Sequence, residues 1–171
     1  MVWKKIAAAA LVPVLAGLPV QALAQAATCR NADEMQAIAI RMLTTELMVA
    51  ALGCAGTTED SFRNRYGAFV QKFNPELVSN GTALKRQYAR RGGDSRMNMM
   101  VTQLANIAEQ RRRSDPNFCL DTDRKLNVGL AAETTTIAQV PLPEDYYTGA
   151  LGVRECTAAA PRPAAPPAAK R

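Results

Sequence analysis

The segment NADEMQAIAIRMLTTELMVAALGC, residues 31–54, decides the fold because it is long, apolar and bounded by helix signals at both ends. Asn31 with Glu34 three residues later has the pattern of a capping box, and Gly53 is a residue type that ends helices. The apolar positions follow helical spacing, and they are Met35, Ile38, Met42, Leu43, Leu47, Val49, Ala50 and Leu52. The segment therefore predicts one helix with a buried face.

Polar residues inside this helix argue against a membrane span. Arg41, Thr44, Thr45 and Glu46 interrupt the apolar stripe in its middle, and a charged side chain is costly at the centre of a bilayer. We therefore expect residues 31–54 to form the core helix of a bundle.

The N-terminal segment MVWKKIAAAALVPVLAGLPVQALAQAA has the features of a secretory signal peptide, with a basic start, an apolar run and small residues near its end. Two A-x-A patterns place cleavage after Ala24 or Ala26, and we prefer the first. An uncleaved anchor is the alternative, but Pro13 and Gly17 interrupt the run, which is shorter than the roughly 20 residues of a spanning helix. We expect residues 1–24 to be removed, leaving no transmembrane segment in a periplasmic or secreted protein.

The rest of the chain divides into a helical domain, residues 25–156, and a tail, residues 157–171. The tail TAAAPRPAAPPAAKR is rich in Pro and Ala without an apolar period, which predicts a disordered arm. The net charge is +6, and loss of Lys4 and Lys5 would leave a modest positive excess. This excess suits another envelope protein or an anionic envelope surface as the partner, and it gives no reason to expect nucleic acid.

A second helical face runs through residues 58–91, where aromatic and aliphatic residues recur at helical intervals. They are Phe62, Tyr66, Phe69, Phe73, Leu77, Leu84 and Tyr88, with Asn80 at the skipped inward position. Pro75 should kink or break this face, because its ring displaces a backbone hydrogen bond. We interpret the segment as one long kinked helix, with two shorter helices as the alternative.

After a turn at two glycines, the chain predicts a third helix over residues 95–113, capped by Asp94 or Ser95. A short helix around residues 123–132 and an extended segment TTTIAQV, residues 134–140, complete the expected elements. The sequence thus predicts an all-α fold, a small disulfide-stapled helical bundle with a long kinked helix hairpin.

The chain contains four cysteines and no histidine. An even number of cysteines in an exported protein indicates two disulfides. The missing C-x-x-C motif argues against a thiol oxidoreductase, and the missing histidine argues against a zinc site. We expect no metal and no cofactor.

Helix geometry limits how the cysteines pair. Cys29 and Cys54 flank a helix of about 22 residues, which is roughly 33 Å long. Because bonded cysteines have Cα atoms within about 7 Å of each other, these two cannot bond to each other. If the aromatic helix is continuous and the next helix doubles back, the pairs are Cys54–Cys119 and Cys29–Cys156. If the chain reverses at the proline, the pairs are Cys29–Cys119 and Cys54–Cys156. We favour the first arrangement because the aromatic face continues through the break.

A cluster of basic residues surrounds the turn between the second and third helices, and it comprises Lys85, Arg86, Arg90, Arg91 and Arg96. These residues could form an anion-binding surface, although a charged run is more often a solvated helix face. Arg111–Arg113 lie on the next helix, about 25 Å away by helix rise. Three nearby methionines, Met97, Met99 and Met100, could bind copper. Met97 and Met100 fall on the core-facing stripe of the helix, which favours core packing.

Three carboxylate pairs are the candidates for two-carboxylate catalysis: Glu59–Asp60, Asp121/Asp123 and Glu144–Asp145. None has a context that defines a cleft, and without histidine the chain lacks Ser-His or Cys-His nucleophiles. We expect no catalytic residues and a non-enzymatic periplasmic binding or interaction protein associated with the envelope. The alternatives are a periplasmic stress chaperone and a carboxylate-dependent cell-wall or glycan hydrolase.

The order of the motifs LMVAALGC, YGAFVQKF, MVTQLANIA and FC resembles an uncharacterised family of small exported, cysteine-containing helical proteins of Gram-negative bacteria. The resemblance covers residues 29–119, and its motifs are structural. It implies the long-helix arrangement and carries over no catalytic residue.

Overall fold

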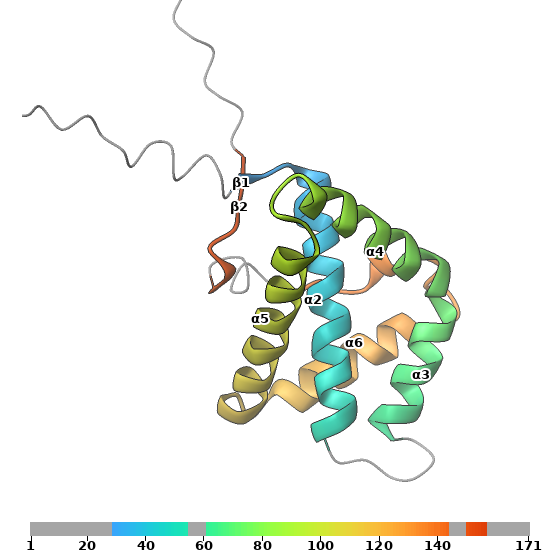
Figure 1. Ribbon diagram of the computed structural model, residues 1–171. Coiled ribbons are helices and arrows are strands. Elements are labelled where there is room, and N and C mark those ends of the chain that lie inside the picture. The colour runs from blue at the N-terminus through green and yellow to red at the C-terminus, as the bar shows by residue number, and fades with distance from the viewer. Residues whose placement is uncertain (1–28, 55–60, 144–149, 157–171) are drawn as a thin grey trace, which may run out of the picture.

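A computed structural model describes residues 29–54, 61–143 and 150–156, and within these residues the fold is all-α with five α-helices (Figure 1). The elements are β1 (Cys29–Arg30), α2 (Ala32–Gly53), α3 (Phe62–Lys72), α4 (Asn74–Ala89), α5 (Gly93–Ser114), α6 (Phe118–Leu130), the 3-10 helix η1 (Ile137–Gln139) and β2 (Arg154–Glu155). The expected signal peptide, residues 1–24, and the expected tail, residues 157–171, lie outside the described residues.

The central element is α2, which has α5 on one side and the α3–α4 pair on the other, with α6 crossing behind it (Figure 1). It begins with the predicted capping box, because the Asn31 side chain accepts the N–H of Glu34 at 2.8 Å and the Glu34 carboxylate accepts the N–H of Asn31 at 3.3 Å. Its length and composition would suit a membrane span, but 61% of its most apolar 18-residue window is buried in the bundle. The predicted core helix is confirmed.

Apolar side chains fill the bundle in two groups. Phe69 and Phe73 lie in the larger group, where they are 0% and 1% exposed and their ring centroids are 4.8 Å apart. The smaller group joins α2 to α4 and α5, and its largest members are Ile38, Met42, Leu84, Tyr88, Met100 and Leu104. Burial of the predicted core residues Met42, Val49, Phe69 and Phe73 is confirmed.

The prediction that Leu52 belongs to the buried stripe of α2 is wrong, because this side chain is 72% exposed. At about 3.6 residues per turn it lies on the opposite side of α2 from the fully buried Leu43 and Ala50. The buried face of α2 therefore follows these two residues to the end of the helix.

The aromatic face of residues 58–91 is divided between α3 and α4, with Phe73 between them. Pro75 lies in the first turn of α4, where its missing N–H needs no helical partner, so the predicted break falls just ahead of it. Figure 1 shows that α4 continues the arc begun by α3 and that α5 then returns beside α2. The segment therefore has the two shorter helices of the alternative, and the predicted hairpin between this segment and α5 is present.

Both disulfides have the favoured pairing. Cys54–Cys119 joins the end of α2 to the first turn of α6, with Cα atoms 5.8 Å apart, and Cys29–Cys156 joins the two ends of the described chain, with Cα atoms 4.8 Å apart. β1 and β2 pair in parallel, with Cys29 opposite Arg154. Two disulfides are typical of a protein from an oxidising compartment, which together with the apolar N-terminal segment suggests an exported protein.

The start of α5 differs from its prediction. The N-cap is Gly92, in the left-handed conformation with φ of 108°, and not Asp94 or Ser95, because the helix already begins at residue 93. Glycine adopts this conformation without the steric cost that other residues meet.

Two later elements also differ. α6 begins at Phe118 and not near residue 123, because the Asp115 carboxylate accepts the N–H of Asn117 at 2.9 Å and starts the turn early. Segment 134–140 was expected to be extended but contains η1, because the Gln139 side chain accepts the backbone N–H groups of Thr135 and Thr136.

Gly129 in α6 lies against Phe69, and a Cβ atom there would come within 2.6 Å of ring atom Cε2. Because the ring is fully buried, Gly129→Ala should lower the free energy of unfolding by about 1–3 kcal/mol through overpacking. Gly67→Ala in α3 is the matched control, since its Cβ would meet nothing within 4 Å. Urea denaturation measures both variants, and equal stability would contradict the close packing at Gly129.

Candidate functional site

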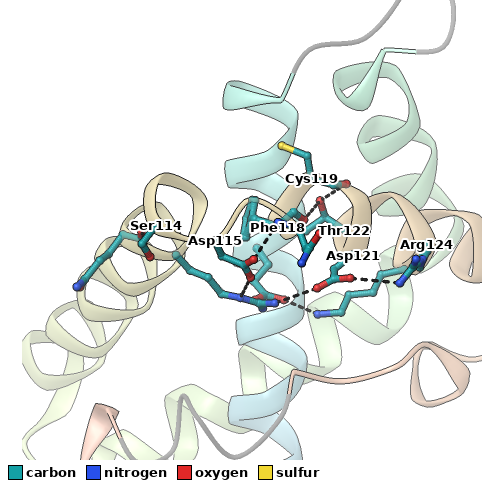
Figure 2. A network of polar contacts seen from close by, with 12 residues as sticks. Ser114, Asp115, Phe118, Cys119, Asp121, Thr122 and Arg124 are labelled. Atoms are coloured by element: carbon teal, nitrogen blue, oxygen red, sulfur yellow. Dashed lines mark hydrogen bonds and ion pairs between the residues drawn. The ribbon is translucent and has the colours of Figure 1, made fainter.

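A network of charged residues lies between α2, α5 and α6 (Figure 2). At its centre the Glu46 side chain is 0% exposed, and its carboxylate accepts hydrogen bonds from Arg111 at 2.6 Å and from Lys125 at 2.7 Å. Arg111 also forms ion pairs with Asp115 at 3.2 Å and with Asp121 at 3.3 Å. Because a buried charge needs such partners, we interpret the network as structural, with ion pairs that hold the three helices together.

Asp121 and Asp123, predicted as one carboxylate pair, contact different cations. Asp121 lies 3.3 Å from Arg111 and 3.5 Å from Arg124, whereas Asp123 forms its ion pair with Arg65. This pairing gives each carboxylate a separate structural partner. The other two predicted pairs, Glu59–Asp60 and Glu144–Asp145, lie outside the described residues.

Asp33 and Glu76 line a cavity of about 260 Å³ between α2 and α4, which sequence reasoning did not expect. Both carboxylate oxygens of Glu76 accept the backbone N–H of Ile137, at 3.1 and 3.3 Å. Glu76 therefore holds η1 against α4, which is a structural role for one of the two carboxylates.

A third arrangement combines several arginines around a cavity of about 500 Å³, which we call the basic cavity. Its lining residues come from β1, the α4–α5 turn, α5 and the segment before β2, and they are Arg30, Tyr88, Arg90, Arg91, Arg96, Met99, Met100, Gln103, Leu151, Gly152 and Val153. The cavity therefore joins parts of the chain that are distant in sequence, and the Cys29–Cys156 disulfide lies beside two of them.

Arg30 is the most unusual residue of the basic cavity. It is 7% exposed, and its Nε and Nη1 atoms are buried without a hydrogen-bond partner among the residues that the structure describes. The Arg30 guanidinium lies over the Tyr88 ring, 5.2 Å from the centroid. The backbone carbonyl of Arg30 accepts the N–H of Cys156 at 2.7 Å. A buried cation without a carboxylate is costly, so this position would be stabilised by a bound anion.

The predicted anion-binding cluster is divided by the structure. Arg90, Arg91 and Arg96 line the basic cavity, whereas Lys85 and Arg86 are exposed on α4 and do not line it. The alternative of a solvated helix face does not describe Arg91, which is half-buried and pairs with Glu34 at 3.2 Å because the capping box holds that carboxylate beside the turn. Sequence reasoning missed Arg30. The local signal for this residue was its position directly after Cys29, a cysteine expected to form a disulfide.

The α4–α5 turn positions the arginines of this cavity. A Cβ atom at Gly92 would come within 2.6 Å of Arg96 Cγ, so the glycine lets the Arg96 side chain lie against the turn. Arg90 and Arg96 form no ion pair with any residue of the described ranges. Their guanidinium groups are therefore available to an anion.

The same cavity has an apolar wall. Met99 is 51% exposed, Met100 is buried, and Leu151 and Val153 pack against the smaller apolar group. Burial of Met100 supports core packing for that methionine over copper binding. Within residues 29–54, 61–143 and 150–156, no group of three or more His, Cys, Asp or Glu residues could hold a metal ion.

Comparisons of the chain with protein-family models, with curated proteins and with solved structures found no match. The resemblance to exported Gram-negative proteins therefore stays a prediction, and the basic cavity has to be interpreted from its own residues.

Proposed function

We propose that this protein is a non-enzymatic periplasmic binding protein whose basic cavity holds a phosphate-bearing, envelope-derived anion. The observation that carries the proposal is Arg30, a buried arginine with two unpartnered N–H groups on the wall of the cavity. Arginine presents its N–H donors in a planar fork that matches phosphate oxygens.

The surroundings of Arg30 support an amphiphilic ligand. Arg90 and Arg96 add positive charge, while Met99, Leu151 and Val153 provide apolar surface. A cavity of about 500 Å³ falls within the range of roughly 300–1,000 Å³ that is usual for ligand sites. A lipid headgroup with the first carbons of its chains combines both chemistries.

Vesicle co-sedimentation tests the proposal, with phosphatidylcholine vesicles that contain phosphatidylglycerol compared with phosphatidylcholine alone. Arg90→Gln/Arg96→Gln should weaken binding to the anionic vesicles about tenfold or more, because a hydrogen bond to a charged group contributes about 1.5–3 kcal/mol and 1.4 kcal/mol is a factor of ten. Lys85→Gln/Arg86→Gln is the matched control, since it removes the same charge from exposed positions of α4 that do not line the cavity. An equal loss in both variants would contradict a cavity site and indicate diffuse surface attraction.

A second arm separates the lipid from free phosphate, through calorimetric titration of the protein with inorganic phosphate. Saturable phosphate binding without vesicle binding would leave the anion site and contradict the envelope source. Arg30→Met gives a further contrast, because it should weaken anion binding without lowering the thermal midpoint. A merely structural Arg30 would instead show a fall in the midpoint with unchanged binding.

A further inference from the structure

A second cavity, of about 230 Å³, lies between α2, α3 and α4, and we call it the Arg41 cavity. Its apolar walls include Met48, Val70 and Leu77, and its polar wall includes Arg41 and Tyr66. None of its lining residues lines the basic cavity. It is therefore a separate site with its own chemistry.

Arg41 has no counter-charge in this cavity. Its Nε atom is buried without a hydrogen-bond partner, and the side chain forms no ion pair within the described part of the chain. Two other partly buried arginines differ, since Arg65 pairs with Asp123 and Arg111 pairs with Glu46. A buried hydrogen-bond donor without an acceptor costs free energy, so an acceptor bound in the cavity would stabilise the folded state.

The remaining polar groups of the wall are already engaged or neutral. The hydroxyls of Thr44 and Thr45 donate to backbone carbonyls of α2, and the Asn80 amide donates to the Ala37 carbonyl at 3.1 Å. Burial raises the pKa of Tyr66, and the positive charge of Arg41 lowers it by a smaller amount. The Tyr66 phenol therefore stays protonated at neutral pH and remains a donor beside the guanidinium.

The size of the cavity restricts its ligand. An apolar cavity of about 150 Å³ can hold benzene, so about 230 Å³ leaves room for one ring or a short chain with a charged group. We propose that the Arg41 cavity binds a small carboxylate with an aromatic or short aliphatic body, its carboxylate on Arg41 and Tyr66 and its body among Met48, Val70 and Leu77.

Benzoate is the probe, and isothermal titration with benzyl alcohol as its uncharged analogue measures the binding. Arg41→Met keeps an unbranched, flexible side chain and removes the charge, and it should weaken benzoate binding about tenfold or more by the scale of one charge-assisted hydrogen bond. Benzyl alcohol should bind weakly and equally to the wild type and this variant. Absence of saturable benzoate binding to the wild type would overturn the proposal.

Gly81→Leu tests the site from the other wall. A Cβ atom at Gly81 meets nothing within 4 Å, and leucine is a better helix former than glycine, so the variant should fold and fill the cavity. It should abolish benzoate binding, whereas the control Gly67→Leu in α3, also free of contacts within 4 Å, should keep it. Benzoate binding by folded Gly81→Leu would overturn the proposal. Vesicle binding should be unchanged in Gly81→Leu, which keeps this test separate from that of the basic cavity.

Discussion

Replacing Glu46 by alanine should lower the free energy of unfolding by about 3–5 kcal/mol, the usual effect of removing one partner from a buried ion pair. The carboxylate is 0% exposed and receives hydrogen bonds from Arg111 and Lys125. Its loss would leave Lys125, whose side chain is 12% exposed, without that counter-charge. Since small domains are stable by about 5–15 kcal/mol, chemical denaturation followed by circular dichroism should show a large shift of the midpoint.

The control for this prediction replaces the three charges together, as Glu46→Leu/Arg111→Met/Lys125→Met. Exchanging a buried ion cluster for apolar residues of similar volume is often neutral or stabilising, so the triple variant should recover most of the lost stability. A triple variant as unstable as Glu46→Ala would show that ion pairing is not the cause. We expect the recovery to be incomplete, because Arg111→Met also removes the ion pairs of Arg111 with Asp115 and Asp121.

Truncating Phe69 to alanine should also cost about 3–5 kcal/mol, because it leaves a cavity in a packed core. The ring is fully buried, contacts Phe73 at 4.8 Å between centroids and lies against Gly129 of α6. Its loss would therefore loosen the contact between α3 and α6. Thermal and urea unfolding measure the effect.

Val78→Ala in α4 is the comparison for the phenylalanine, because Val78 is 62% exposed. Its effect should stay within about 0.5 kcal/mol, as for other surface substitutions. A similar loss in both variants would mean that the aromatic face is not the centre of the core.

The elements that local rules govern could be predicted from the sequence. The capping box at Asn31 and Glu34 is a pattern of neighbouring residues, and the pairing of Cys54 with Cys119 followed from helix rise and the path of the next helices. The start of α6 was missed because Asp115 closes a turn through a side-chain hydrogen bond. Such a bond leaves no periodic signal in the apolar pattern.

The candidate sites were less predictable, because their contacts are distant in sequence. Glu46 is 65 residues from Arg111 and 79 residues from Lys125. Its position three residues after Leu43 puts it on the buried face of α2, and this spacing could have indicated a paired core carboxylate. Arg30 shares the wall of its cavity with Leu151–Val153, and no local pattern connects these segments.

The Cys29–Cys156 disulfide sets an order of events during synthesis. Its cysteines are 127 residues apart, so at roughly 5–20 residues per second the first thiol waits on the order of 6–25 s for its partner. Cys54 follows Cys29 after 25 residues and Cys119 only after 90, so until late in this interval Cys54 is the competing thiol. Once α2 has formed, its length holds Cys54 out of reach of Cys29. The basic cavity, whose walls include parts of the first and last described segments, is then completed last, so a nascent chain presents its core helices long before it can capture a ligand.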